Sequence, residues 1–197
     1  MTFNGLIIST MRIHYGFDSL SAIERPVVTI GSFDGVHRGH AALLGEVVQE
    51  ARRIGGRSVV VTFDPHPREV LPRGGEFRLL TTIAQKAQLL EALGVDELIV
   101  VEFTLAFAAL SSEEFVRDFL VAKLGVDTLV VGYNHRFGHD VGVSADHFER
   151  LAEKYGFALH RASAYTYEGG KVSSSVIRAL VESGEIQRAE ELLGHKL

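Results

Sequence analysis

Two histidines with a glycine between them stand directly after a run of β-branched residues. His37 and His40 end the segment Gly31-Ser-Phe-Asp-Gly-Val-His-Arg-Gly-His40, and residues 27–31 predict a buried strand. Residues three apart share one turn of a helix, and the glycine at 39 lets backbone N–H groups approach an anion. Two imidazoles beside a helix N-terminus favour a phosphate site; a capped helix with two exposed histidines is the alternative.

A second cluster of polar residues stands near the end of the chain. Ser173, Ser174 and Ser175 open a predicted helix in the segment Val172-Ser-Ser-Ser-Val-Ile-Arg178. Hydroxyls at a helix start cap N–H groups or bind phosphate oxygens. Arg178 lies one turn further on the same face, where a guanidinium can clamp phosphate. Taken alone, a serine cap with an exposed arginine explains this segment equally well.

Two loops that follow predicted strands also combine unusual residues. The loop Phe63-Asp-Pro-His-Pro67 offers a stiff apolar rim that suits a flat ring, although a strand-ending turn explains its prolines as well. In the loop Gly132-Tyr-Asn-His-Arg-Phe-Gly138, Asn134 can hydrogen-bond a nucleotide and Phe137 can pack on a ring. A plain polar turn is the alternative for this loop.

Composition excludes several classes of protein. Of the 197 residues, 46% are hydrophobic and 23% charged, which predicts one globular domain. Because cysteine is absent, disulfides and thiol chemistry are excluded. A net charge of −5, from 20 basic and 25 acidic residues, argues against a nucleic-acid partner. No apolar run reaches the ~18 residues of a membrane span. We expect a cytoplasmic location. The P-loop and G-x-G-x-x-G motifs are also absent.

Apolar strands alternate with amphipathic helices along the chain. The patterns predict strands at 27–31, 58–63, 97–103, 128–132 and 157–160, and helices at 40–54, 82–93, 111–123, 144–155, 173–183 and 186–193. This order predicts an α/β fold with a doubly wound parallel sheet. Ligands of such sheets bind beyond the carboxyl ends of the strands, so all four motifs should face one crevice.

With its four motifs in this order, the chain resembles the N-terminal module of bacterial bifunctional FAD synthetases, the riboflavin kinase / FMN adenylyltransferase family. The resemblance runs from about residue 11 to residue 193. It implies a Rossmann-like, HIGH-type nucleotidyltransferase domain over residues 11–197, with residues 1–10 as an N-terminal extension. We expect the family's C-terminal riboflavin kinase domain to be absent from this chain, and a separately encoded riboflavin kinase is then a candidate partner.

The resemblance implies a reaction in which ATP and FMN, with Mg²⁺, give FAD and pyrophosphate. Matched by position, the implied catalytic residues are His37, His40 and Arg178. The implied ATP-binding residues are Gly31, Phe33, Asp34, His37, His40, Asn134, Ser173, Ser174, Ser175 and Arg178. The implied flavin-binding residues are Phe63, Pro65, Pro67 and Phe137. Metal ligands and oligomeric state are left open, and so are two other functions: a nucleotidyltransferase with another phosphorylated acceptor, and a non-catalytic flavin or nucleotide binder.

Overall fold

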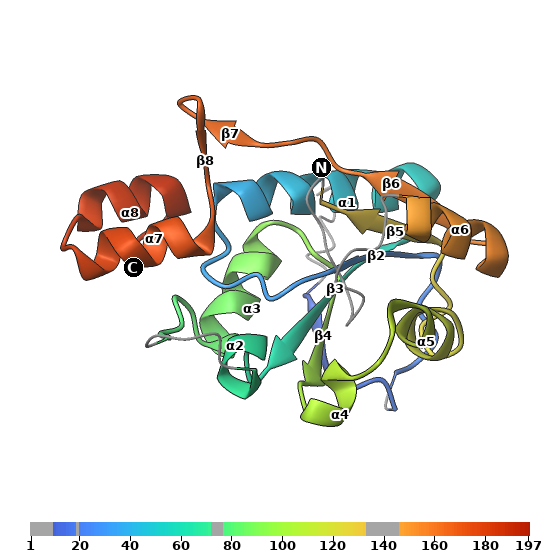
Figure 1. Cartoon of the computed structure of the whole chain (residues 1–197). Helices are drawn as coiled ribbons and strands as arrows, with labels where there is room; N and C mark the ends of the chain where they lie inside the picture. The colour runs from blue at the N-terminus through green and yellow to red at the C-terminus, as the bar shows by residue number, and fades with distance from the viewer. Residues whose placement is uncertain (1–9, 19, 72–76, 133–145) are drawn as a thin grey trace, which may run out of the picture.

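A six-stranded parallel sheet forms the centre of the computed structural model, which describes residues 10–18, 20–71, 77–132 and 146–197 (Figure 1). Its strands are β1 (Arg12–Tyr15), β2 (Pro26–Ile30), β3 (Arg57–Asp64), β4 (Glu97–Glu102), β5 (Thr128–Val131) and β6 (Ala158–Arg161). They lie in the order β1-β4-β3-β2-β5-β6. All five predicted strands are therefore confirmed, and β1 is an addition.

The helices follow the strands as the sequence predicts, with small changes at their ends. They are α1 (Arg38–Ile54), α2 (Pro67–Val70), α3 (Ile83–Ala92), α4 (Leu105–Ala108), α5 (Ser112–Phe115), the π-helical η1 (Val116–Val121), α6 (Asp146–Tyr155), α7 (Ser174–Glu182) and α8 (Ile186–Leu193). A short hairpin, β7 (Thr166–Tyr167) and β8 (Gly170–Lys171), connects β6 to α7. The predicted helix at 111–123 divides into α5 and η1, whereas the short α2 and α4 and the hairpin gave no periodic signal.

Helices cover both faces of the sheet, which confirms the doubly wound fold. Alternate residues of each strand point to opposite faces. Val28 and Ile30 of β2 pack in the cluster formed with α5, η1 and α6, whereas Val27 packs against α1. Helix α3 shares the α1 side, where Leu44 and Leu90 are buried together. Because each strand is covered twice, the strands read as continuous apolar runs.

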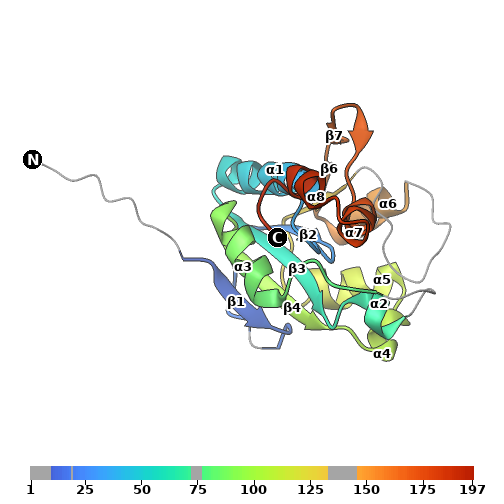
Figure 2. The same ribbon diagram turned by 90° about the vertical axis from the view of Figure 1, so that its left-hand side faces the viewer.

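The chain reverses its direction of travel across the sheet next to β2. From β2 it proceeds to β3 and β4 on one side, whereas β5 and β6 lie on the other. Helices α7 and α8 lie beyond this point, beside the start of α1 (Figures 1 and 2). Arg38 holds them there, because its Nε donates to the Glu191 carbonyl at 2.6 Å. The crevice at such a reversal is where doubly wound sheets bind ligands.

Strand β1 was not predicted, because its neighbours in the fold are distant in sequence. It pairs with β4 at the sheet edge and is held by the buried carboxylate of Glu97. That carboxylate forms an ion pair with Arg12 and lies 2.9 Å from Nε2 of His14. A four-residue strand fixed by a long-range ion pair leaves no local pattern.

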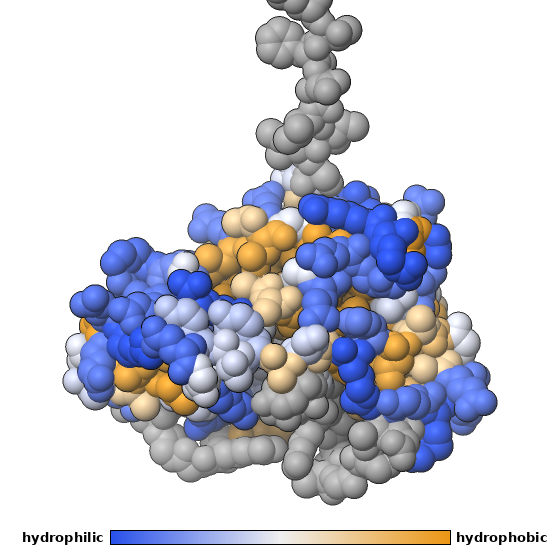
Figure 3. Space-filling view, turned by 90° about the horizontal axis from the view of Figure 1, so that it is seen from above, coloured by the Kyte–Doolittle hydropathy of each residue, from blue (hydrophilic) through white to orange (hydrophobic). Residues whose placement is uncertain are grey.

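The surface seen from above is mostly hydrophilic, with hydrophobic patches between the polar side chains (Figure 3).

Two glycines around α1 give a matched stability test. A Cβ at Gly45, inside α1, would meet nothing within 4 Å, whereas a Cβ at Gly56 would lie 2.2 Å from the carbonyl oxygen of Arg25. We expect Gly45→Ala to raise the free energy of unfolding by roughly 0.5–1 kcal/mol, because alanine favours helix. Gly56→Ala should lower it by roughly 1–3 kcal/mol through the backbone clash. Urea unfolding measures both, and a Gly56→Ala variant as stable as the parent would contradict the close approach.

Candidate functional site

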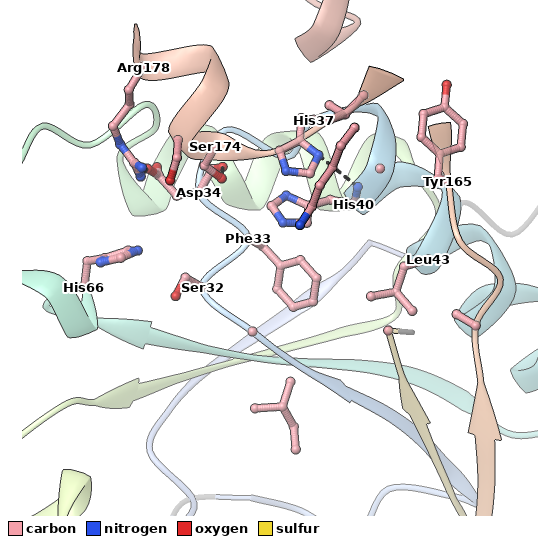
Figure 4. A pocket seen from close by; sticks show the side chains of 18 of the residues that line it. Ser32, Phe33, Asp34, His37, His40, Leu43, His66, Tyr165, Ser174 and Arg178 are labelled. Atoms are coloured by element: carbon pink, nitrogen blue, oxygen red, sulfur yellow. Dashed lines mark hydrogen bonds and ion pairs between the residues drawn. The ribbon is translucent and has the colours of Figure 1, made fainter. Parts of the chain in front are cut away.

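A cavity of about 460 Å³ opens at the carboxyl edge of the sheet. Its walls come from the segments 30–43, 66–68, 162–165 and 171–178, together with Gly132. Figure 4 shows two stacked imidazoles in its middle, with Arg178, Asp34 and Ser174 on one side and Tyr165 on the other. The H-x-G-H turn and the serine-arginine segment therefore line one cavity, as expected from the strand order.

The histidine pair is fixed at the N-terminus of α1. His37 caps the helix, and its Nδ1 accepts the backbone N–H of His40 at 3.2 Å. The two rings stack with their centroids 3.6 Å apart and an angle of 14° between the planes. A Cβ at Gly39 would come within 3.2 Å of the His37 ring, so glycine permits this stacking. The pair and the free N–H groups of α1 face the same space, an arrangement that suits an anion.

The turn between β2 and α1 is strained. Phe33 and Val36 adopt positive φ angles of 46° and 36°, which are costly for residues with a Cβ. Gly35 adopts a φ of 81°, and a Cβ there would lie 2.9 Å from a methyl carbon of Leu80. Surrounding contacts must hold such a turn in place.

Asp34 supplies the main contact that holds this turn. Its carboxylate is 1% exposed and accepts the backbone N–H groups of Leu80 and Thr81, each at 3.0 Å. It also accepts the Thr81 hydroxyl and forms an ion pair with Arg178. Asp34 therefore lines the cavity, but its carboxylate oxygens are bonded to the protein.

The start of α7 is bonded to the same turn. The Ser174 hydroxyl donates to the Asp34 carbonyl at 2.9 Å, and the Ser173 hydroxyl caps α7. Nε of Arg178 donates to the Arg78 carbonyl at 2.8 Å. The Arg178 guanidinium lies 4.5 Å from the ring centroid of Phe77. Arg178 is thus held in one orientation at the cavity wall.

The imidazoles of the cavity are uncharged at neutral pH. Burial lowers the pKa of His37 to about 4 and the pKa of His40 well below its usual 6.5. Nδ1 of His40 is buried and is the one such side-chain atom without a hydrogen-bond partner in the described part of the chain. The positive charge on the described cavity wall therefore belongs to Arg68, Lys171 and Arg178, beside the partial positive charge of the α1 N-terminus.

The cavity wall also contains residues that were not predicted as site residues, among them His66, Arg68, Tyr165 and Lys171. His66 is 8% exposed, and its Nδ1 accepts the Arg68 N–H at 3.1 Å, so a neutral ring carries its proton on Nε2. Burial lowers the pKa of His66 to about 4. His66 lies inside the proline loop, and Lys171 lies just before the serine segment. Their positions in or beside these motifs could have identified both as candidate site residues. Tyr165 had no such signal.

The residues expected beside a flavin are placed differently from those of the H-x-G-H turn. Phe63 is buried in the core, where its ring lies 5.4 Å from Phe103 and 5.8 Å from Phe107. Pro65 is exposed and Pro67 begins α2, and the cavity lining includes none of these three residues. The proposed rim of the loop is thus formed by His66 instead of Phe63, because β3 turns the Phe63 ring inward. Asn134 and Phe137 lie outside the described residues.

The described ranges contain no candidate metal cluster and no candidate membrane span. No three His, Asp or Glu side chains gather there as a metal site would require. None of the helices in those ranges is both long and apolar enough to cross a bilayer.

A solved structure shares this architecture. A crystal structure described as a macrolide-efflux protein from Streptococcus pneumoniae matches with a TM-score of 0.83 and 27% sequence identity. The match covers 95% of this chain and 72% of that chain. The arrangement of sheet and helices is therefore the same over nearly the whole chain.

Sequence comparisons point to one family. The chain is 35% identical over 189 residues to the bifunctional riboflavin kinase/FMN adenylyltransferase of Escherichia coli K12, covering 94% of this chain and 60% of that protein. The protein of the same description from Pseudomonas fluorescens is 37% identical over 169 residues, covering 85% of this chain and 54% of the relative. The chain thus spans somewhat more than half the length of these curated relatives. A family model described as FAD synthetase matches residues 20–176, and the chain belongs to the FAD synthetase family.

Proposed function

We propose that this chain transfers the AMP group of ATP to FMN, giving FAD and pyrophosphate. One observation supports this most: the stacked His37–His40 pair and Arg178 face one cavity at the N-terminus of α1. The relatives are named for FMN adenylyltransfer as well as for riboflavin kinase activity. The cavity geometry supports the first activity for this chain, because it concentrates hydrogen-bond donors where a phosphate chain can lie.

The reaction needs positioning and charge stabilisation more than a base. A phosphate oxygen of FMN attacks the α-phosphorus of ATP in line, the bond from that phosphorus to the bridging oxygen breaks, and pyrophosphate leaves with the electron pair. A phosphate monoester is already anionic at neutral pH, so its oxygen is a competent nucleophile. The barrier then depends on donors placed around the transferring phosphoryl group.

The histidine pair can supply those donors without a net charge. Since Nδ1 of His37 accepts the His40 amide N–H, the neutral His37 ring carries its proton on Nε2. That N–H and the α1 amides can donate to the α-phosphate. Ser175 and the remaining N–H groups of Arg178 would hold the departing pyrophosphate from the α7 side. Gly31 and Phe33 would line the nucleotide, as the resemblance implies.

We place FMN toward the loop at 63–67. His66 presents Nε2–H there, a donor for the FMN phosphate, and Arg68 adds positive charge beside it. The roles of Phe63, Pro65, Pro67, Asn134 and Phe137 in flavin or nucleotide binding stay predictions. ATP would bind as its magnesium complex, because the oxygen donors on the described cavity wall are mainly serine hydroxyls and the triphosphate supplies the ligands that Mg²⁺ prefers.

The direct test measures pyrophosphate release and FAD formation from ATP, Mg²⁺ and FMN. Reactions with riboflavin, with a sugar phosphate, or with phosphopantetheine in place of FMN serve as controls. Product formation with FMN alone supports the proposal. Release with another acceptor would assign the cavity to a different nucleotidyltransferase, and binding of ATP and FMN without release would assign it to a non-catalytic binder.

We expect His40→Ala to lower turnover at least tenfold, because removing one preorganised donor typically costs 10²–10³ in rate. His160→Ala is the matched control, since His160 lies on β6 and bonds to Glu46 away from the cavity. Steady-state FAD synthesis measures the effect, with thermal melting as the check of folding. Turnover equal to that of the parent would remove His40 from the catalytic residues.

We expect Arg178→Lys to raise the KM for ATP by about tenfold while the affinity for FMN changes little, since lysine keeps the charge but loses the bidentate fork. Lysine also keeps a cation beside buried Asp34, which Arg178→Ala would leave unpaired. Arg117→Ala, an exposed residue paired with Asp118, is the control. A loss confined to FMN binding would reverse the assignment of the α7 side to ATP.

The lowered pKa of His66 predicts an acid-sensitive fold. The unfolded ring gains a proton below about pH 6.5, whereas the folded ring stays neutral down to about pH 4. The stability that the neutral His66 ring contributes is therefore fully present above about pH 6.5 and is lost as the pH drops toward 4. His66→Asn keeps a cap acceptor without a titrating ring. We expect the parent to lose roughly 1–2 kcal/mol more than this variant between pH 7.5 and pH 5 in urea unfolding. Equal losses would contradict the buried neutral ring.

A further inference from the structure

A buried lysine lies behind the cavity and has no role in the reaction described above. Lys86 belongs to the first turn of α3, is 2% exposed, and its Nζ donates to the Thr62 hydroxyl at 3.2 Å. Among the described residues, no carboxylate lies within salt-bridge distance of this ammonium. Buried charges are costly unless an opposite charge compensates them. The partner that compensates Lys86 is therefore missing from the described part of the protein.

A relay of hydrogen bonds joins Lys86 to the cavity floor. The Thr62 hydroxyl accepts from Lys86 and donates its own hydrogen to the Ser32 carbonyl at 3.1 Å. Ser32 lines the cavity at the start of the H-x-G-H turn. The ammonium thus lies one side chain behind the cavity wall, and it fixes which way the Thr62 hydroxyl points.

The Lys86 charge also reaches the cavity through space. It contributes to the lowered pKa values of His40 and His66, which stand on different parts of the cavity wall. Burial lowers the pKa of Lys86 itself, opposed by the charges of Asp34 and Asp64. These effects agree with a position directly behind the cavity.

The buried charges nearest the cavity do not balance. Asp34 forms its ion pair with Arg178 and accepts three further hydrogen bonds from Leu80 and Thr81. Asp34 is therefore the one buried carboxylate beside Arg178 and Lys86 among the described residues, since Asp64, whose charge also acts on Lys86, is exposed. The position of Lys86 in the first turn of α3 adds to the free-energy cost of burying its charge, because a helix N-terminus disfavours a cation. A bound polyanion would restore the balance.

We infer that Lys86 is a positioning residue for polyphosphate. It directs the Thr62 hydroxyl to the Ser32 carbonyl, and its ammonium is balanced by bound triphosphate or pyrophosphate instead of a protein carboxylate. The identity of this anion rests on the proposed function. The Lys86 charge should therefore destabilise the empty protein and stabilise the complex with the anion.

The test uses Lys86→Met, which keeps an unbranched side chain one atom shorter and removes the charge. We expect its melting temperature without ligand to rise, because methionine carries no charge to bury. Its affinity for Mg²⁺–pyrophosphate, measured by isothermal titration on the full chain, should fall by about tenfold. Lys123→Met, at an exposed lysine paired with Asp18, should leave the pyrophosphate affinity unchanged. Thr62→Val keeps the Lys86 charge, interrupts the relay and should also weaken pyrophosphate binding.

A merely structural lysine would move stability and affinity together. A lower melting temperature, a variant that does not fold, or an unchanged pyrophosphate affinity in Lys86→Met would each overturn the inference, as would a parent that does not bind pyrophosphate. None of these measurements uses FMN or turnover. If the parent made no FAD while Lys86→Met still showed the opposite shifts, the proposed function would fail and the polyphosphate role of Lys86 would stand.

Discussion

The ion pair between Asp34 and Arg178 links two of the segments that form the cavity wall. It connects residues 144 positions apart and joins the strained turn after β2 to a helix that the chain reaches through the β7–β8 hairpin. The Ser174 hydroxyl bonds α7 to the same turn, and His195, just after α8, lies 2.9 Å from the Gly35 carbonyl. The same carboxylate bonds the backbone at Leu80 and Thr81, so it also fixes the entry to α3. A single buried acid thus aligns three segments around the space where a phosphate chain would lie.

This interaction also separates residues that contact ligand from residues that place them. The polar atoms of Asp34 and Lys86 form hydrogen bonds within the protein. The imidazoles of His37 and His66 each accept a backbone N–H at one nitrogen and leave the other nitrogen available. A cap that consumes Nδ1 determines the tautomer of a neutral histidine. Helix capping therefore orients each of these rings and determines which of its nitrogens can donate a hydrogen bond.

Sequence patterns predicted what is local and failed where the structure depends on distant contacts. The buried strands, the helices and the two motifs that line the cavity follow from runs of residues and short spacings. The edge strand β1 depends on Glu97, and the bonding of the Asp34 carboxylate depends on Arg178, so neither could be read from its neighbours in sequence. Phe63 shows a further limit. Its position at the end of a strand was right, but the direction of its ring depends on the pleat of β3 and on Phe107 of α4.

Burial gives this cavity a particular electrostatic character. Three imidazoles are kept neutral by the surroundings that place them, so under the proposed function they would bind phosphate oxygens through directed hydrogen bonds more than through charge. The fixed cations stand behind or beside them, already oriented before any ligand arrives. Such preorganisation lowers the reorganisation needed at the moment of reaction, and its cost appears in the empty protein as a strained turn and unbalanced buried charge. Under the proposed function, this lower stability without ligand would accompany stronger stabilisation of the charge that develops in the transition state.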